Sequence, residues 1–189
     1  MWWLRLHRNG GRLARLALVL AAASLTAGCF QPLYATHPVV GGTESVRDKL
    51  AAVQIPVIKA PQGSPAQRLA IALRNALQYD LNGAAGANAP THRLVVHVGG
   101  SIFTVTIDPN SGRPSGNIAN VSASFQLIEI ATGKVVVHDS TFAHVDYDIP
   151  GVEQRFAGQR ARRDAEDHAV QVVAEAIRNR LASYFVAGT

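Results

Sequence analysis

Residues 120–127 alternate strictly between polar and apolar side chains, and this pattern limits the fold more than any other feature of the sequence. Val121, Ala123, Phe125 and Leu127 fall on one side of an extended chain, and Asn, Ser and Gln residues fall on the other. A strand with one apolar and one polar face is typical of an antiparallel sheet packed on one side only. We therefore expect these residues to lie in such a sheet.

The segments on either side of this strand predict two antiparallel partners. Residues 94–107 alternate in their second half, and the ten residues that follow them are rich in turn formers. The pair Gly99-Gly100 inside the first segment indicates a bulge or a sharp bend. Residues 131–134 predict a tight turn, after which residues 135–142 return as the last strand. Together these segments predict a three-strand meander.

A short strand and a helix precede the meander. Residues 52–58 predict a strand, and Pro56 places it at an edge of the sheet because proline cannot donate to the ladder. The sequence Ser64-Pro65-Ala66-Gln67 is a capping-box pattern that begins a helix, and Gly83 can end that helix.

Residues 153–185 predict a second, longer amphipathic helix. Its expected apolar stripe consists of Ala161, Ala165, His168, Ala169, Val172, Val173, Ala176, Ile177, Leu181 and Tyr184. Its expected solvated face consists of Arg155, Arg160, Arg162, Arg163, Asp164, Glu166 and Asp167. The element order is β-α-β-β-β-α, so we predict an α+β fold with two helices packed on one face of a four-stranded mixed sheet.

Residues 1–28 predict a lipoprotein signal peptide. Four arginines precede residue 16, and no acidic residue occurs before Glu44. The uncharged stretch of residues 16–28 has 13 residues, too few for a spanning helix of about 20. Ala27-Gly28-Cys29 resembles a bacterial lipobox, in which small residues let the peptidase cut between Gly28 and Cys29.

Cys29 is the predicted lipid attachment site. It is the only cysteine, which excludes an internal disulfide and a cysteine zinc site. We expect a diacylglycerol on its thiol, a further acyl chain such as palmitate on its amine, and a firm membrane anchor. Phe30 follows, where aspartate would favour the inner membrane, so the outer membrane is expected. The alternative is a secreted protein with a free thiol.

The charge of the mature chain argues against nucleic acid as a partner. The precursor carries a formal charge of +5, but residues 29–189 hold 14 Lys and Arg against 13 Asp and Glu. Binding to phosphate backbones needs a clustered excess of cations, which is missing here. Residues 29–50 contain several prolines and glycines and predict a lipidated N-terminus and tether, leaving residues 51–189 as a single domain.

The search for catalytic and metal-binding residues finds little. Gly99-Gly100-Ser101 lacks the Gly-x-Ser-x-Gly pattern of a nucleophile elbow. His138 and His144 are an even number of residues apart and can share a strand face, but no third metal ligand accompanies them. His97 lies in an apolar strand and is expected to be half-buried.

Acidic and basic residues near the expected turns are also candidates. Asp146, Asp148 and Glu153 lack the spacing of a calcium loop, so a solvated loop is expected, with no metal site. Arg113 lies in a glycine-rich loop and Lys134 in the hairpin turn. Exposed cations of this kind can bind the phosphates of lipopolysaccharide, and these two residues are the candidate contacts.

The start of the mature chain carries a family resemblance. The sequence Gly28-Cys29-Phe30-Gln31-Pro32-Leu33-Tyr34 resembles the Gly-Cys-Gly-Phe-Arg-Pro-Leu-Tyr start of the LptE family of lipopolysaccharide-assembly lipoproteins. The glycine after the cysteine is missing, and glutamine replaces the arginine. Residues 67–77, the long final helix and the β-α-β-β-β-α order also resemble that family.

The resemblance implies a role without catalysis and without a cofactor apart from the acyl chains. Such lipoproteins form a plug in the LptD β-barrel of the Gram-negative outer membrane, assist its assembly and bind lipopolysaccharide during export. The domain is then expected on the periplasmic side or inside the barrel lumen. A polar sheet face would suit the polar lumen of a barrel. Two alternatives are a general periplasmic lipid-anchored binding module of another envelope complex and a lipid-anchored hydrolase.

Overall fold

A computed structural model describes residues 45–83, 89–110, 112, 114–149 and 154–188. All of them belong to the compact unit of Thr36–Thr189. In chain order, they form α2 (Val46–Ala51), β1 (Val53–Gln54), α3 (Pro65–Asn82), β2 (His92–Ile107), β3 (Pro114–Glu129), β4 (Val135–Asp148) and α4 (Arg155–Ala187). None of the helices in these ranges combines the length and apolar composition needed to cross a membrane.

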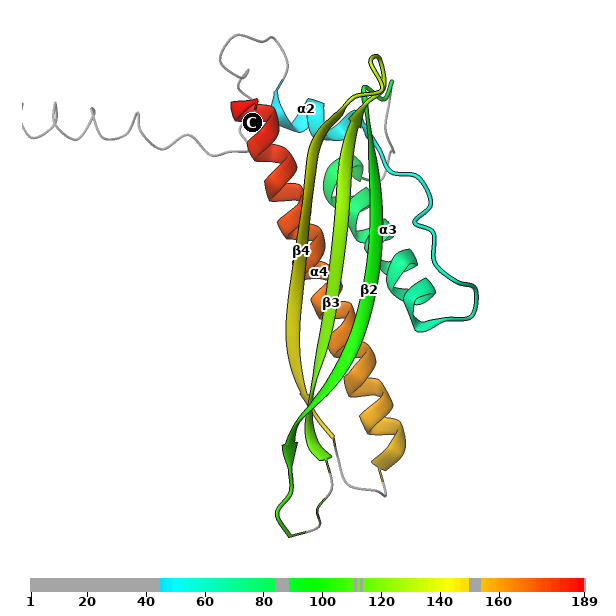
Figure 1. Ribbon diagram of the computed structural model, residues 1–189, viewed down its shortest axis with the longest axis vertical. Coiled ribbons are helices and arrows are strands. Elements are labelled where there is room, and N and C mark those ends of the chain that lie inside the picture. Colours follow the sequence, from blue (N-terminus) through cyan, green and yellow to red (C-terminus); the bar gives the residue numbers. More distant parts are fainter. Residues whose placement is uncertain (1–44, 84–88, 111, 113, 150–153, 189) are drawn as a thin grey trace, which may run out of the picture. The chain divides into compact units, whose positions relative to one another are not determined.

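The strands form one mixed sheet in the order β1-β2-β3-β4. β1 pairs with β2 in parallel, and β2, β3 and β4 form the predicted antiparallel meander. Helices α3 and α4 pack on one face of this sheet (Figure 1). The predicted α+β fold, with two helices on one face of a four-stranded mixed sheet, is confirmed.

The core lies between the two long helices and the sheet. Each strand contributes every second side chain to it, as the alternation of residues 120–127 predicts. The largest fully buried side chains are Phe125, Leu73, Leu77, Leu94, Leu127, Ile177 and Leu181, from α3, α4 and the sheet. Burial of this apolar area is the main favourable contribution to folding.

Helix α3 begins where the sequence predicts. The side chain of Ser64 accepts a hydrogen bond from the backbone amide of Gln67, and Pro65 is the first helical residue. The capping box is only half formed, because the Gln67 side chain accepts from the amide of Gly63 instead of Ser64. Gly83 follows the helix with φ 63°, a conformation that favours glycine.

The paired glycines of β2 do not form the predicted bulge. The register with β3 continues through Gly99 and Gly100 and shifts only between Thr104 and Ile107. Gly100 instead lies against helix α3: a Cβ atom there would lie 2.5 Å from Leu69 Cδ1, so the Leu69 side chain would have to move. The absence of a side chain lets the helix approach the strand closely.

The start of the domain also differs from the prediction. Residues up to 50 were predicted as a tether, but α2 occupies Val46–Ala51 and buries Val46 and Leu50 in the core. Ser45 and Asp48 form a reciprocal capping box at its first turn. The predicted strand at residues 52–58 is reduced to Val53–Gln54, at the sheet edge as expected.

Candidate partner-binding face of the sheet

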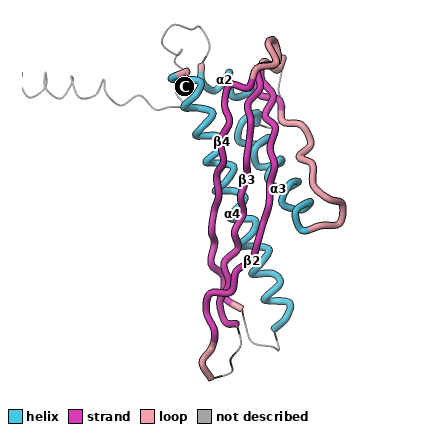
Figure 2. The backbone as a smooth tube through the Cα atoms, viewed as in Figure 1, coloured by secondary structure: helices cyan, strands magenta, loops and turns pink. Residues whose placement is uncertain are grey.

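None of the described helices covers one of the two faces of strands β2, β3 and β4. Figures 1 and 2 show α3 and α4 on the same side of these strands, and no other described helix packs on the opposite side. The side chains that point towards the helices include the buried Leu94, Val96, Val121, Ala123, Phe125, Leu127, Val137 and Ala143. The opposite side is called the open face below.

The strand register arranges twelve residues in four rows across the middle of the open face. The rows are Val95–Gln126–His138, His97–Ser124–Ser140, Gly99–Ser122–Phe142 and Ser101–Asn120–His144. Nine of the twelve have polar side chains, and none is Asp, Glu, Lys or Arg. Such a surface offers many hydrogen-bonding groups, and covering it avoids the high cost of desolvating unpaired ionic charges.

Large apolar side chains gather on the open face near the hairpin that joins β2 to β3. The next row is Phe103–Ile118–Asp146, and Phe103 is 53% exposed. Phe142 is 65% exposed and packs its ring against His144 with centroids 5.0 Å apart. Exposed apolar side chains of this kind commonly mark an interaction surface. The open face is therefore a mainly polar band that contains Phe142 and is followed by the row of Phe103 and Ile118.

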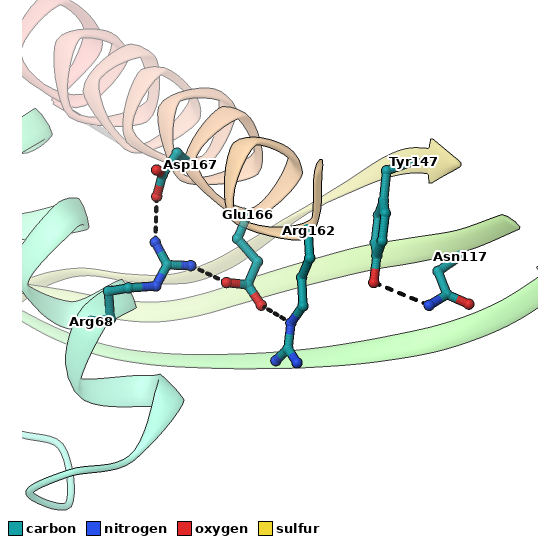
Figure 3. A network of polar contacts seen from close by, with 6 residues as sticks. All are labelled: Arg68, Asn117, Tyr147, Arg162, Glu166 and Asp167. Atoms are coloured by element: carbon teal, nitrogen blue, oxygen red, sulfur yellow. Dashed lines mark hydrogen bonds and ion pairs between the residues drawn. The ribbon is translucent and has the colours of Figure 1, made fainter. Parts of the chain in front are cut away.

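At the same end, the helix-facing side carries polar side chains. Tyr147 and Asn117 point towards the helices from neighbouring strands, and the Asn117 side-chain amide donates to the Tyr147 hydroxyl at 3.1 Å (Figure 3). Tyr147 and Asn117 are thus hydrogen-bonded on the helix-facing side. Their sequence neighbours Asp146 and Ile118 face the open side. The two faces remain chemically distinct to the end of the sheet.

The predicted lipid and lipopolysaccharide sites fall mostly outside the described residues. This holds for Gly28, Cys29 and Arg113. Lys134 is exposed in the β3–β4 turn, as expected, and its backbone amide donates to the Thr132 hydroxyl. The strand ends that flank residue 113 lie at the other end of β3, about 50 Å away at about 3.3 Å per residue. A single small ligand cannot contact both ends of the sheet.

The two candidate histidines of β4 lie too far apart to bind one metal ion together. His138 and His144 share the open face, as predicted, but lie six residues apart on one strand, or about 20 Å. His97 was expected to be half-buried and is instead exposed on the same face. Within the described part of the chain, no group of three His, Cys, Asp or Glu side chains is placed to hold a metal ion.

The prediction of a loop at Asp146 and Asp148 is wrong, because strand β4 continues past the predicted end at residue 142 as far as Asp148. Both side chains are exposed on that strand, and Glu153 lies outside the described residues. Ser101 is an exposed strand residue whose hydroxyl accepts from the Asn120 side chain at 3.2 Å. Neither group supports a nucleophile or a cation site.

The sequence profile of a known family matches the chain over residues 50–181, which cover most of the described domain. That family is described as LptE: Lipopolysaccharide-assembly. The chain belongs to the LptE family. No curated relative matches the chain by sequence.

Solved structures of other bacterial proteins resemble this domain. A lipoprotein from Caulobacter crescentus CB15 superposes with a TM-score of 0.58 at 20% identity, covering 76% of this chain and 97% of its own. A protein from Xanthomonas campestris gives 0.50 at 14% identity, covering 84% and 93%. The rare lipoprotein B from Shewanella oneidensis gives 0.49 at 16% identity, covering 71% and 96%. At these identities the first two show a shared fold alone.

An ionic network on the helix side of this LptE-family domain was missed by the sequence analysis. Glu166 was predicted on the solvated face of α4, but only 9% of its side chain is exposed. It contacts the Arg68 guanidinium of α3 and accepts from Arg162 Nε at 2.9 Å, while Asp167 accepts from Arg68 at 2.6 Å (Figure 3). The i,i+4 spacing of Arg162 and Glu166 signals their pairing, but not their contact with α3.

Two residues of the predicted apolar stripe were expected to be buried and are exposed. His168 is exposed and Val172 is 42% exposed, whereas Ala174 and Ala182 are buried in their place. The predicted stripe was chosen only from the spacing of apolar residues along α4. Contact with α3 as well as with the sheet rotates the buried surface, and this rotation also buries Glu166.

Two titratable groups are perturbed at the end of the domain near α2. Burial lowers the pKa of His92, whose ring packs edge-on against Phe185 with centroids 5.2 Å apart. Hydrogen bonds from the side chain and then the backbone of Ser45 lower the pKa of Asp48. Both shifts follow from packing and helix capping, and neither group lies on the open face.

Proposed function

We propose that this LptE-family lipoprotein forms a plug complex with an LptD-like outer-membrane β-barrel. In this complex the protein assists barrel assembly and the insertion of lipopolysaccharide at the cell surface, without catalysis. Acyl chains on Cys29 hold it at the membrane after cleavage behind Gly28. Arg113 and Lys134 remain the proposed lipopolysaccharide contacts of the two hairpin turns.

The open face is the observation that carries this proposal. It spans three strands, contains no Asp, Glu, Lys or Arg in its four central rows, and is covered by no described helix. The inner wall of a large barrel is itself lined by polar side chains. Two polar surfaces can exchange hydrogen bonds with water for hydrogen bonds with each other at little net cost.

The decisive experiment is co-purification. The full chain is tagged at its C-terminus, outer membranes are solubilised in mild detergent, and the recovered proteins are identified. We expect a stoichiometric, heat-modifiable β-barrel. Recovery of the acylated chain alone, or with other envelope proteins, would refute the plug and favour a general lipid-anchored binding module.

A pair of variants tests the role of the open face. Ser124→Arg places an unpaired charge in a central row, and we expect at least a tenfold loss of recovered barrel because that charge must be desolvated on binding. Gln171→Arg places the same charge on an exposed position of α4, on the helix side, and serves as the matched control. Equal loss from both variants would mean that the open face is not the principal contact.

The anchor is tested separately by metabolic labelling. Wild-type chain is expected to incorporate radioactive palmitate and to fractionate with outer membranes. Cys29→Ser removes the only thiol, so label and membrane association should both be lost. Label retained in this variant would contradict the assignment of Cys29.

A further inference from the structure

A groove on the helix side of the domain lies between the start of α3 and the first half of α4. It has a volume of about 480 Å³, within the range of sites that hold small ligands. The side chains that matter are Ser64 and Arg68 from α3 and Gln159, Arg162, Arg163 and Glu166 from α4. The groove is therefore separate from the open face.

The groove is positively charged overall, because three arginines line it with one carboxylate. Glu166 is the buried member of this group and contacts both Arg68 and Arg162. Asp167, outside the groove lining, holds the other terminal nitrogen of Arg68. The carboxylates thus fix one guanidinium on each helix, which reduces the side-chain entropy that a ligand would otherwise have to overcome.

Two guanidinium groups still have donors to offer a ligand. Arg162 uses its Nε for Glu166, and its two terminal nitrogens bond to none of the described residues. Arg163 makes no ion pair within the described part of the chain and is exposed. Paired terminal nitrogens of arginine match the oxygen spacing of phosphate, which makes arginine the preferred side chain for this anion.

The start of α3 adds to the positive electrostatic potential of the groove. Gly63, Ser64 and Pro65 lie on the groove wall, where the helix macrodipole contributes partial positive charge. The first turn of α3 contains no acidic residue to neutralise it. Phosphate groups are stabilised by this combination of arginine donors and a helix start.

We propose that the α3–α4 groove binds a phosphate-bearing ligand, with Arg162 and Arg163 as donors and Glu166 as the residue that positions Arg68 and Arg162. The phosphorylated sugar headgroup of lipopolysaccharide has the required chemistry, and this choice of source rests on the proposed function. Free phosphate shares that chemistry and is the other source. The site is distinct from the hairpin cations Arg113 and Lys134.

The test measures ligand binding to the full lipidated chain in nonionic detergent. The probes are lipopolysaccharide, enzymatically dephosphorylated lipopolysaccharide and inorganic phosphate, each titrated at low and at high salt. Arg163→Gln removes the unpaired guanidinium, and Arg160→Gln is the matched control, since it removes an exposed arginine of the same helix that does not line the groove.

We expect Arg163→Gln to weaken lipopolysaccharide binding roughly tenfold and Arg160→Gln to change it less than threefold. Dephosphorylated lipopolysaccharide should bind both variants alike. Binding of inorganic phosphate alone that depends on Arg163 would support the groove and assign it to free phosphate. Equal losses in both variants, or no loss in Arg163→Gln, would overturn the proposal.

Co-purification separates this inference from the proposed function. Arg163→Gln is expected to recover the barrel as well as wild type does, because the groove and the open face lie on opposite sides of the sheet. A chain that binds phosphate through Arg163 but recovers no barrel would refute the plug and leave the groove assignment intact. Thermal unfolding of Arg163→Gln should match wild type, since no ion pair is lost.

Discussion

The two faces of the β2–β3–β4 sheet are built from the same strands, and only one of them determines stability. The helix-facing side carries Phe125, Leu127 and Val121, each at most 2% exposed. The open face carries Ser122, Ser124 and Gln126, which alternate with them along β3. Along each strand, alternate residues therefore contribute either to the core or to the open face proposed for recognition. Predictions about the two faces should therefore diverge even for neighbouring positions.

The largest expected difference is between two phenylalanines. Phe125→Ala removes a fully buried ring and should lower the free energy of unfolding by about 3–5 kcal/mol, a large share of the 5–15 kcal/mol typical of a domain. Phe142→Ala on the open face should change it by less than about 0.5 kcal/mol. Denaturant titration of the full chain measures both. Similar losses would show that Phe142 is covered in the free protein.

The next prediction concerns adjacent glycines. Gly100→Val places its Cβ 2.5 Å from Leu69 Cδ1, so the buried Leu69 side chain of α3 must move, and we expect a loss of about 1–3 kcal/mol in unfolding free energy. Gly99→Val on the other face meets only Ser122 Oγ at 3.8 Å and should be neutral or slightly stabilising, because valine favours strands. Equal effects would mean that α3 does not approach Gly100 closely.

Substitutions of polar side chains on the two sides should also differ in their effect on the free energy of unfolding. Glu166→Gln removes the charge that holds Arg68 and Arg162 and should lower the unfolding free energy by about 1–2 kcal/mol. The value is at the low end because the two arginine side chains are 37% and 46% exposed, and solvent screens the pairs. Ser124→Ala should be neutral. A neutral Glu166→Gln would show that the network contributes little.

The smallest effect is a pH dependence from the helix-facing side. Burial lowers the pKa of His92, so its charged form is disfavoured in the folded state. The resulting stability is fully present above the unfolded pKa of about 6.5 and is lost as pH falls from there through the depressed folded pKa. His92→Gln should flatten the unfolding free energy measured across that acidic window. An unchanged slope in this variant would assign the pH dependence to other groups.

Several local features of this chain were predictable because the signal lies in neighbouring residues. The alternation of residues 120–127 predicts strand β3 and both of its faces. Ser64-Pro65 begins α3, and the amphipathic pattern of residues 153–185 predicts α4, which spans Arg155–Ala187. The Ser45-x-x-Asp48 spacing is a local capping signal of the same kind, and it predicts the start of α2 once residues 30–50 are not assumed to be tether.

For the candidate site, the sequence predicted the polar composition of the sheet face but not its exposure. The sequence indicates a Ser- and Asn-rich strand face, but whether helices cover one side of the sheet or both depends on contacts far apart in the chain. Glu166 illustrates the limit: its helix position and charge indicate solvent, and only α3 packing against α4 buries it with Arg68, 98 residues away. A neighbour at that separation leaves no local pattern.

The sequence by itself determined the order of the elements from β1 to α4 and the alternation of the strands, while the leader and the acylation of Cys29 stay predictions. These properties depend on residues a few positions apart, where propensity, capping and periodicity act. The tertiary structure decided which sheet face stays open, why Gly100 has no side chain, and which arginines meet across α3 and α4. Those outcomes depend on close packing between distant segments, where a single atom too many or a single charge decides the geometry.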